Sequence, residues 1–468
     1  MRVLLISPNV EFLPDPVFPI GLAYLAALLK KKDIPHQVLD LCFAEDYESA
    51  TRSALIGFQP DVVGLSLRNL DNVSFPNYIS YLPFYRQVVR TVRKHSRAVV
   101  VLGGSGFTLM PDRILNHLEG DFGIVGEGEA SFIRLLDHLE DDRDGRSLGL
   151  GRVLRQPEIT EDLDSIPHPD WSAFDHEAYM KWGGMGNIQT KRGCPFECIY
   201  CTYPLIEGKT VRLRNPGRVC DELEEMLDLG LSTVFFVDNA FNYPLHHGEA
   251  ICREIIDRNL TVNWSCYVNP RFMTRRLSGL MVSSGCTSVE FGSDAADEMM
   301  LANLGKGFTL EDLRRASILC RDVGLSFCHS VLLGGPGETM ETVKRSLEAI
   351  REMSPTAVIC MVGIRVFPNT RLHALALKEG LIDPEQSSLE PLFYLSPAVR
   401  DEILPWIKAF SKENSSWIFP GLNINMDVKL QKKLRRFGIK GPLWEHMKVG
   451  ERMRKRRRGH LSENPFTG

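Results

Sequence analysis

The sequence predicts an α/β protein: a Rossmann-like, doubly wound domain, then a partial (β/α)6 TIM barrel, then a small, partly helical C-terminal region. Three observations predict it. Short β-branched runs alternate with helical periodicity at the start of the chain, a proline-containing connector follows, and six more strand patterns then alternate with helical ones. The expected boundaries are residues 1–148 for the first domain, 149–186 for a linker, 187–370 for the barrel and 371–468 for the C-terminal region.

The first domain contains the strand patterns "RVLLIS", "HQVLDL", "DVVGLSL", "AVVVLGG" and "FGIVGEGE". After the first of these, Leu22, Leu25, Ala26 and Leu29 recur at helical spacing. Continuous apolar strands indicate a parallel sheet that is covered on both faces. Ligands of such sheets bind at the carboxyl ends of the strands. The candidates there are Asp40 and residues 7–9, 66–72, 103–108 and 126–129.

The connector "EDLDSIPHPDWSAFD" carries prolines and no strand or helix period, which indicates an interdomain linker. The barrel strands that follow are "GNIQTK", "TVFFVDN", "VNWSCYVN", "SVEFGSD", "SFCHSVLLG" and "VICMVGIRVF". Barrel active sites lie where the strands end. The polar residues at those ends are Asp238, Asn239, Asn269, Ser293, Asp294 and Arg365.

Composition places the chain among ordinary globular proteins, with 468 residues, 44% hydrophobic and 24% charged, and a net charge of −4. No apolar run approaches the roughly 18–20 residues that span a bilayer, and the N-terminus lacks an export signal. The eleven cysteines do not suggest a disulfide framework, so we expect a reducing cytoplasm. The basic segment 429–458 is expected to be a solvated end without a nucleic-acid partner, because aromatic residues are few in it.

The stretch "RGCPFECIYC" places three cysteines, Cys194, Cys198 and Cys201, on a loop after the first barrel strand. Thiolates bind soft metals and iron–sulfur clusters, and a [4Fe–4S] cubane normally takes four. Three ligands leave one iron open, as catalytic metal sites require. The alternatives are a zinc site completed by a distant residue such as Cys220, or three buried core cysteines; the flanking glycine, proline and glutamate favour a loop.

These residues resemble the CxxxCxxC signature of the radical SAM superfamily, including the aromatic Tyr200 before the last cysteine. The resemblance implies that Cys194, Cys198 and Cys201 are catalytic residues that hold a [4Fe–4S] cluster. The fourth iron would chelate S-adenosylmethionine (SAM). One electron from an external reductant, passed through the cluster, would cleave SAM to a 5′-deoxyadenosyl radical.

The same resemblance implies further SAM contacts. The backbone of Tyr200 would meet adenine, and Asp238 or Asn239 in "VDNAF" would receive the SAM ammonium, where the family usually has a GGE run. Lys306 would meet the SAM carboxylate, with a surface lysine as the alternative. The remaining implied contacts are Ser293 and Asp294 to the ribose hydroxyls, Gly334 and Gly335 for close backbone approach, and Ile364 and Val366 to adenine.

Residues 1–370, with "VVVLGGSGFTLMPDRIL" and "GIVGEGE" ahead of the barrel, resemble the cobalamin-binding branch of radical SAM enzymes. The resemblance implies that cobalamin is bound by Ser66, Arg68, Gly103, Gly104 and Thr108. The DxHxxG motif of classical cobalamin modules is absent, so cobalamin would lack a histidine lower ligand. Arg68 has no lone pair for a metal and would favour low-coordinate, nucleophilic cobalt; the alternatives are a surface arginine or a phosphate contact.

We therefore expect a cobalamin-dependent radical SAM methyltransferase that moves a methyl group from SAM, via methylcobalamin, to an unreactive carbon of a biosynthetic substrate, either a small molecule or a peptide. If Arg68 acts as described, polar transfer to an sp² carbon becomes possible. Two alternatives stay open. One is a radical rearrangement or cyclisation that uses cobalamin without methyl transfer. The other is a cluster-bearing binding protein without turnover.

Overall fold

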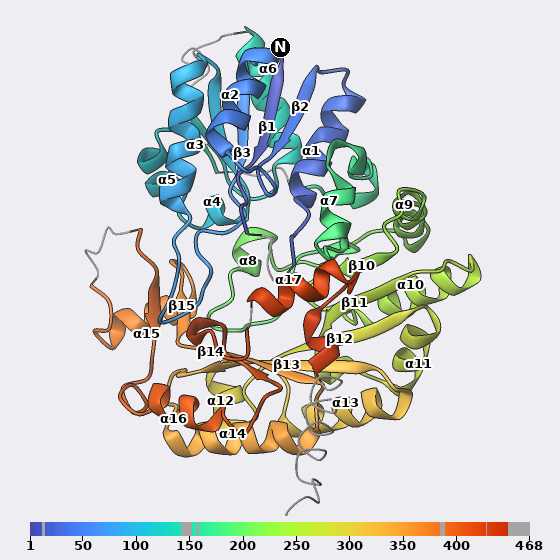
Figure 1. The fold of residues 1–468 in the computed structure, drawn as a ribbon, viewed down its shortest axis with the longest axis vertical. Coiled ribbons are helices and arrows are strands. Elements are labelled where there is room, and N and C mark those ends of the chain that lie inside the picture. The colour runs from blue at the N-terminus through green and yellow to red at the C-terminus, as the bar shows by residue number, and fades with distance from the viewer. Residues whose placement is uncertain (12–14, 142–151, 156–158, 384–388, 427, 448–468) are drawn as a thin grey trace, which may run out of the picture.

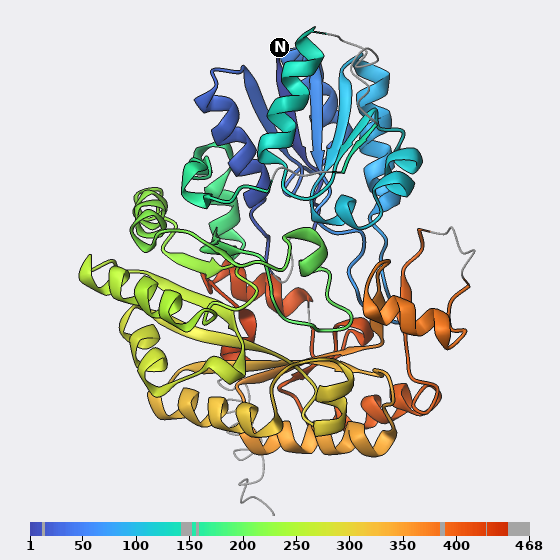
Figure 2. The same ribbon diagram turned by 180° about the vertical axis from the view of Figure 1, so that it is seen from behind.

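The structure is a computed structural model, and it describes residues 1–11, 15–141, 152–155, 159–383, 389–426 and 428–447. Two α/β lobes lie one above the other, and the helix α17 (Val428–Arg436) lies between them (Figure 1). Seen from behind, the strands of the upper lobe point with their carboxyl ends toward the lower lobe (Figure 2). The predicted fold class, two parallel-sheet α/β units in this order, is confirmed.

The upper lobe is built on a parallel sheet of six strands in the order β2-β1-β3-β4-β5-β6. The chain crosses over at β1, so the sheet is wound in both directions from there. Helices α1 and α6 pack on one face of the sheet, and α2, α3 and α5 pack on the other. The elements are β1 (Val3–Ser7), α1 (Ile20–Lys31), β2 (His36–Asp40), α2 (Tyr47–Phe58), β3 (Val62–Ser66), α3 (Leu82–His95), β4 (Val99–Gly103), α4 (Ser105–Leu109), α5 (Pro111–Leu118), β5 (Phe122–Ile124), α6 (Glu129–Asp141) and β6 (Val153–Leu154).

The lower lobe is a parallel sheet of seven strands in the order β17-β14-β13-β12-β11-β10-β7. Helices α10 to α14 cover its outer side (Figures 1 and 2). The elements are β7 (Gly186–Ile188), β8 (Lys191–Arg192), α8 (Tyr203–Ile206), β9 (Arg212–Leu213), α9 (Pro216–Asp228), β10 (Thr233–Phe236), α10 (Leu245–Asp257), β11 (Asn263–Val268), α11 (Arg275–Ser283), β12 (Cys286–Asp294), α12 (Glu298–Asn303), α13 (Leu310–Val323), β13 (Ser326–Leu333), α14 (Met340–Met353) and β14 (Ala357–Val362).

All six predicted barrel strands are present, with two breaks. The "GNIQTK" pattern divides into β7 and β8. The strand β8 pairs antiparallel with β9, and the cysteine loop lies between these two strands in the sequence. The "VICMVGIRVF" pattern divides at Gly363 into β14 and β15 (Ile364–Val366), which pairs with β16 (Leu392–Tyr394). Gly363 has a positive φ of 70°, a conformation that suits glycine and turns the chain out of the barrel sheet.

The segment predicted as a linker without secondary structure is more ordered than expected. It contains β6, two 3₁₀ turns (Leu163–Ser165 and Trp171–Ala173) and α7 (His176–Lys181). Aspartate side chains cap each of the last three. The ring of Phe18 stacks on that of Tyr179 at 4.0 Å and meets Trp171 edge-on, so this segment belongs to the core.

The C-terminal region was predicted to be less regular, yet it completes the barrel sheet. The strand β17 (Trp417–Ile418) pairs in parallel with β14 as a seventh strand. The other elements described here are α15 (Arg371–Lys378), α16 (Ile403–Phe410), α17 and two short 3₁₀ turns, Pro420–Leu422 and Leu443–His446. The basic run 454–458 lies outside the described residues. The predicted domain boundaries stay predictions.

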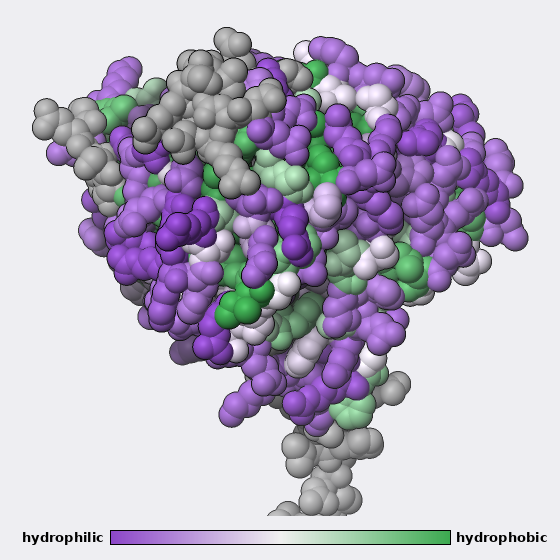
Figure 3. Space-filling model, turned by 90° about the horizontal axis from the view of Figure 1, so that it is seen from above, coloured by the Kyte–Doolittle hydropathy of each residue, from purple (hydrophilic) through white to green (hydrophobic). Residues whose placement is uncertain are grey.

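Within the described part of the chain, no helix is long and apolar enough to cross a membrane. Seen from above, hydrophobic side chains form separate patches on a mainly hydrophilic surface (Figure 3).

Candidate active site

The loop of three cysteines follows β8 and is braced on two sides. Ile199, between the second and third cysteines, donates its N–H to the Leu304 carbonyl at 3.1 Å and accepts from Leu372 N–H at 2.8 Å. A Cβ on Gly193 would lie 2.0 Å from the Thr210 carbonyl oxygen, so only glycine fits at that position. Backbone contacts therefore help to hold the loop in place.

All three loop cysteines are free thiols; Cys194 is buried, and Cys198 and Cys201 are partly exposed. Burial, with a smaller contribution from the neighbouring thiols Cys198 and Cys194, raises the pKa of Cys201 to about 12, and Lys306 opposes this effect. The three thiols thus lie within electrostatic range of one another. Since ligands must be deprotonated, loading this site with a metal cluster would release protons.

The donor set fits a cubane better than it fits zinc. Among the described residues, no group of three or more His, Cys, Asp or Glu side chains converges on a single-ion site. A cubane does not need such convergence, because each cysteine binds a different iron. Cys220, the proposed fourth zinc ligand, is buried in α9, and its charged neighbours are Arg258 and Glu254 of the outer helices.

Three of the predicted SAM contacts meet beside the cysteine loop. Lys306 Nζ lies 2.5 Å from Asp294 Oδ2 and 3.2 Å from the Tyr200 hydroxyl, and that hydroxyl also contacts Asp294. Burial acts to lower the pKa of Lys306, but the Asp294 carboxylate raises it above its usual range, so the lysine stays charged. The alternative of a surface lysine is wrong, since Lys306 is buried.

Asp238 and Asn239, the two predicted acceptors for the SAM ammonium, differ in whether a side-chain oxygen is still free to accept a hydrogen bond. Both oxygens of Asp238 are occupied, by Thr190 N–H at 2.8 Å and by the Thr190 hydroxyl at 2.6 Å, with Lys191 Nζ 3.4 Å away. Asn239 Oδ1 is buried and has no hydrogen-bond partner within the described part of the chain. Its Nδ2 donates to Glu207 Oε2 at 3.3 Å. Asn239 is therefore the acceptor that remains available to a cation.

Ser293 does not present its hydroxyl to this site. The residue is fully buried, and its Oγ lies 2.6 Å from His329 Nδ1 on the neighbouring strand β13. Burial lowers the pKa of His329 to about 3, so the imidazole is neutral and suits this contact with a hydroxyl. This position does not favour the prediction that Ser293 receives a ribose hydroxyl, and the same role for Asp294 stays a prediction.

The glycines predicted to admit SAM are packed closely by the protein itself. Gly334 and Gly335 both donate their N–H to the carboxylate of Glu338, at 2.9 Å for Gly335. A Cβ on Gly334 would lie 2.2 Å from a Leu395 methyl. The predicted adenine-packing residues Ile364 and Val366 are buried in the hydrophobic cluster that also contains Ile199, with Tyr200 packed against it.

A cavity of about 870 Å³ lies between the carboxyl edges of the two sheets. Four of the five predicted cobalamin contacts line it, namely Ser66, Arg68, Gly103 and Gly104. Thr108 does not; its hydroxyl donates to the Gly104 carbonyl at 3.0 Å and accepts from Gly126 N–H at 2.9 Å. Thr108 therefore ties two glycine turns together behind the cavity wall, which corrects its predicted role as a ligand contact.

Arg68 is exposed to this cavity rather than engaged in the fold. No salt bridge involves it among the residues that the structure describes. Its positive charge acts on Tyr203 of α8 and on Tyr267 of β11, where it opposes the effect of burial on the pKa of each phenol. An upper-lobe guanidinium therefore lies within electrostatic range of the barrel.

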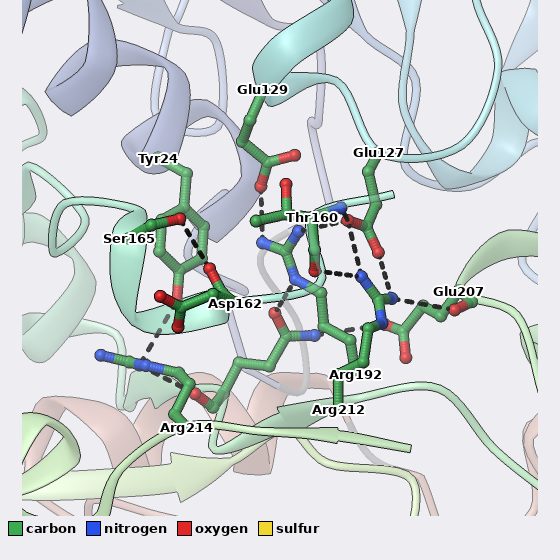
Figure 4. A network of polar contacts seen from close by, with 11 residues as sticks. Tyr24, Glu127, Glu129, Thr160, Asp162, Ser165, Arg192, Glu207, Arg212 and Arg214 are labelled. Carbon is green, nitrogen blue, oxygen red and sulfur yellow. Dashed lines mark hydrogen bonds and ion pairs between the residues drawn. The ribbon is translucent and has the colours of Figure 1, made fainter. Parts of the chain in front are cut away.

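An ion-pair network that the sequence did not reveal joins the lobes next to the cysteine loop (Figure 4). Arg192, two residues before the first cysteine, lies 2.5 Å from Glu129 and 3.2 Å from Glu127. Arg212 donates to Glu127 at 3.0 Å and to the Thr160 carbonyl at 2.8 Å. Burial acts to raise the pKa of Glu129, but Arg192 holds it below its usual value.

Two further buried arginines join the lobes. Arg365 of β15 lies 2.9 Å from Asp71 of the upper lobe, and both side chains are buried. Arg435 of α17 is fully buried and contacts Asp15, and it donates to the Gly441 carbonyl at 2.9 Å. The polar residue predicted at the end of the sixth barrel strand, Arg365, thus serves the interface between lobes.

Known families match both lobes of the chain. Residues 188–350 match the radical SAM superfamily, and residues 9–136 match the B12 binding domain. The radical SAM match together with the cysteine loop defines the chain as a radical SAM enzyme. With the B12 binding domain ahead of it, the chain combines the two domains that define cobalamin-dependent radical SAM enzymes.

The chain is similar to a tryptophan 2-C-methyltransferase of Streptomyces laurentii, with 26% identity over 437 residues, which cover 78% of this chain and 73% of the relative. An uncharacterized methyltransferase of Pyrococcus horikoshii is 27% identical over 400 residues, covering 82% and 84%. Among solved structures, the radical SAM methyltransferase TsrM of Kitasatospora setae, with cobalamin and a [4Fe–4S] cluster bound, has a TM-score of 0.84 and 24% identity over 98% of this chain and 99% of that one.

Proposed function

We propose that this chain is a cobalamin-dependent radical SAM methyltransferase that moves a methyl group from SAM to a carbon of a small-molecule or peptide substrate. The observation that carries the proposal is the continuity of the cavity. Its wall includes Gly104 at the edge of the upper sheet, Thr202 next to the last cysteine, and Tyr267 inside the barrel. A methyl carrier at the upper sheet and an acceptor in the barrel can therefore meet beside the cysteine loop.

On the barrel side, Cys194, Cys198 and Cys201 would hold the [4Fe–4S] cluster, which when bound supplies the electron that cleaves SAM. Asn239 Oδ1, buried and without a partner in the described chain, would accept a hydrogen bond from the SAM ammonium. Lys306, kept charged by Asp294, would face the SAM carboxylate. These residues orient SAM by complementary charge before any chemistry begins.

On the upper side, Ser66, Gly103 and Gly104 would border the cobalamin, which when bound supplies a carrier for the methyl group. Arg68 lines the same wall and has no lone pair to offer a metal. We infer that it disfavours axial ligation and so supports polar transfer to an sp² carbon. Arg68→Leu should change the absorption spectrum of bound cobalamin and slow methyl transfer, whereas Arg68→Lys should change both less; an unchanged spectrum and rate in Arg68→Leu would contradict this role.

The proposed chemistry implies that the protein works in a reducing compartment and receives electrons from a donor. All eleven cysteines are free, which suits the cytoplasm. An external one-electron reductant would have to reach the cluster.

Product analysis tests the proposal. Anaerobically reconstituted protein receives cobalamin, SAM, a reductant and candidate substrates, and the nucleoside products are quantified. S-adenosylhomocysteine together with 5′-deoxyadenosine supports radical methylation, and S-adenosylhomocysteine alone supports the polar route. 5′-Deoxyadenosine alone, or no consumption of SAM, contradicts methyl transfer. Cys198→Ala, which removes one cluster ligand, should abolish formation of 5′-deoxyadenosine, with Cys220→Ala as the matched control.

A further inference from the structure

We propose that Glu290 binds a positively charged group of the substrate, such as a protonated amine, and that the rest of the bound molecule is apolar or aromatic. This inference rests on the proposed function, because it takes the shared cavity as the place where the substrate is methylated. Glu290 was not among the site residues predicted from the sequence.

Glu290 lies on β12 with its side chain toward the cavity. Its neighbours Val289 and Phe291 are fully buried in the hydrophobic cluster under the outer helices, and side chains alternate between the two faces of a strand. Glu290 itself lines the cavity between the lobes. A strand of the barrel sheet therefore presents a carboxylate to whatever enters the cavity.

The carboxylate is poorly compensated within the protein. Ser330 of β13 donates its hydroxyl to Glu290 Oε1 at 2.6 Å. Burial raises the pKa of Glu290, and the Ser330 hydrogen bond is the only interaction that opposes the effect, so no lysine, arginine or histidine acts on it. A buried carboxylate without a cation is costly, and the cost disappears when a cationic ligand binds.

Several other buried carboxylates of the described chain are matched by cations. Glu222 lies 2.6 Å from Arg214, Asp71 lies 2.9 Å from Arg365, and Asp294 lies 2.5 Å from Lys306. Glu338 has no cation but receives two backbone N–H groups. By contrast, Glu290 has a single hydroxyl and an opening onto the cavity.

The walls around Glu290 are apolar and aromatic. Phe235 and Tyr267 meet edge-on with their ring centroids 5.2 Å apart, and both line the cavity. Ile359 of β14 and Trp444 of the C-terminal 3₁₀ turn line it as well. Such walls favour a hydrophobic body, and aromatic faces also attract a cation. The pocket thus selects for one positive charge on an otherwise apolar molecule.

The test compares amines with isosteric alcohols, because the two differ mainly in charge. Tryptamine and tyramine are titrated by calorimetry against their alcohol counterparts, tryptophol and tyrosol, into the cluster- and cobalamin-loaded protein without SAM. Since a hydrogen bond to a charged group is worth more than one to a neutral group, we expect each amine to bind about ten- to a hundredfold more tightly than its alcohol.

Two variants test whether Glu290 is the residue that causes the preference for amines. Glu290→Gln keeps the volume and can still accept from Ser330, and it should remove the preference for amines. The matched control is Glu445→Gln, because Glu445 is also held by a serine, Ser288, at 2.5 Å, and burial raises its pKa too, yet it does not line the cavity. This control should keep the preference.

Equal binding of amine and alcohol by the wild-type protein would overturn the inference, as would the absence of binding by either. A preference that survives in Glu290→Gln would overturn it too. The wild-type comparison does not depend on any variant folding. Because no SAM is present, binding is read separately from methyl transfer: an amine preference without S-adenosylhomocysteine formation would sink the proposed function alone, and the reverse result would sink the role of Glu290 alone.

Discussion

Four glutamates of the described chain line the cavity, and they differ in how their charge is compensated. At the interface, Glu127 and Glu129 are paired with Arg192 and Arg212, and the pKa of Glu129 is held low despite its burial. On the barrel side of the cavity, burial raises the pKa of both Glu207 and Glu290. The charges of Glu127 and Glu129 are compensated by arginines of the protein, whereas Glu207 and Glu290 can still be compensated by a bound ligand.

The largest expected effect comes from converting a compensated glutamate into an uncompensated one. Arg192→Ala would leave Glu129 buried without its cation, which typically destabilises a protein by about 3–5 kcal/mol. Urea unfolding of the protein without cofactors measures this loss. Adding Glu129→Gln to the variant should restore at least half of the lost stability, because the uncompensated charge is then gone.

The control for Arg192 is Arg258→Ala. Arg258 bridges Asp221, Glu224 and Glu254 on the surface of the outer helices, where exposed pairs contribute about 0–1 kcal/mol. Equal losses from the interface and the surface substitutions would remove the distinction between the two regions.

The next effect belongs to the predicted SAM site beside the cysteine loop, where a change should alter binding and leave folding intact. Asn239→Ala removes the unpartnered Oδ1, so SAM should bind about ten- to a hundredfold more weakly, since a hydrogen bond to a charged group is worth about 1.5–3 kcal/mol. Equilibrium dialysis of SAM against the cluster-loaded protein measures the change. Thr309→Ala, in a helix cap away from the cavity, should lower stability and leave SAM affinity unchanged, and the opposite pattern in either variant would contradict the assignment.

The smallest effect concerns a carboxylate compensated by backbone N–H groups alone. Burial raises the pKa of Glu338 to about 7, above its unfolded value of 4.5. The native state therefore binds the proton more tightly, and the stability it gains falls as the pH rises from about 4.5 to 7. Glu338→Gln stays neutral and can still accept both N–H bonds, so relative to the wild type it should gain about 1–2 kcal/mol between pH 5 and pH 8.

Urea midpoints at several pH values measure this gain. The matched control is Glu341→Gln in the first turn of α14, three residues after Glu338, because that side chain is 80% exposed and pairs with Arg345 at the surface. Its difference from the wild type should not depend on pH over this range. A flat profile for Glu338→Gln would show that the two backbone N–H groups compensate the buried charge fully.

The sequence was sufficient for the features that local pattern controls. The strands, their parallel sheets and the cysteine loop follow from apolar runs, turn residues and spacing, and four of the five cobalamin candidates line the cavity because strand ends of a parallel sheet meet at one edge. The orientation of single side chains could not be predicted from the sequence. Ser293 and Asp294 could not be told apart because β12 is irregular there, with a register shift after Gly292 and a positive φ of 61° at Asp294.

Contacts between distant segments were also beyond the sequence. The supposed linker became core because Phe18 stacks on Tyr179, and Arg192 met Glu129 across 63 residues of chain. Neither pairing has a local signal. Glu290 was missed for a related reason, since a glutamate in a strand pattern does not reveal whether its counter-ion is present.

Methyl transfer within the shared cavity is tested most directly by following an isotopic label. Reconstituted protein with cobalamin and reductant receives SAM that carries a trideuterated methyl group, together with a substrate found by the amine screen, and mass spectrometry follows the label. We predict S-adenosylhomocysteine and a substrate heavier by one labelled methyl group bound to carbon. Recovery of the label only in methionine or unreacted SAM, with 5′-deoxyadenosine as the sole nucleoside product, would contradict the account.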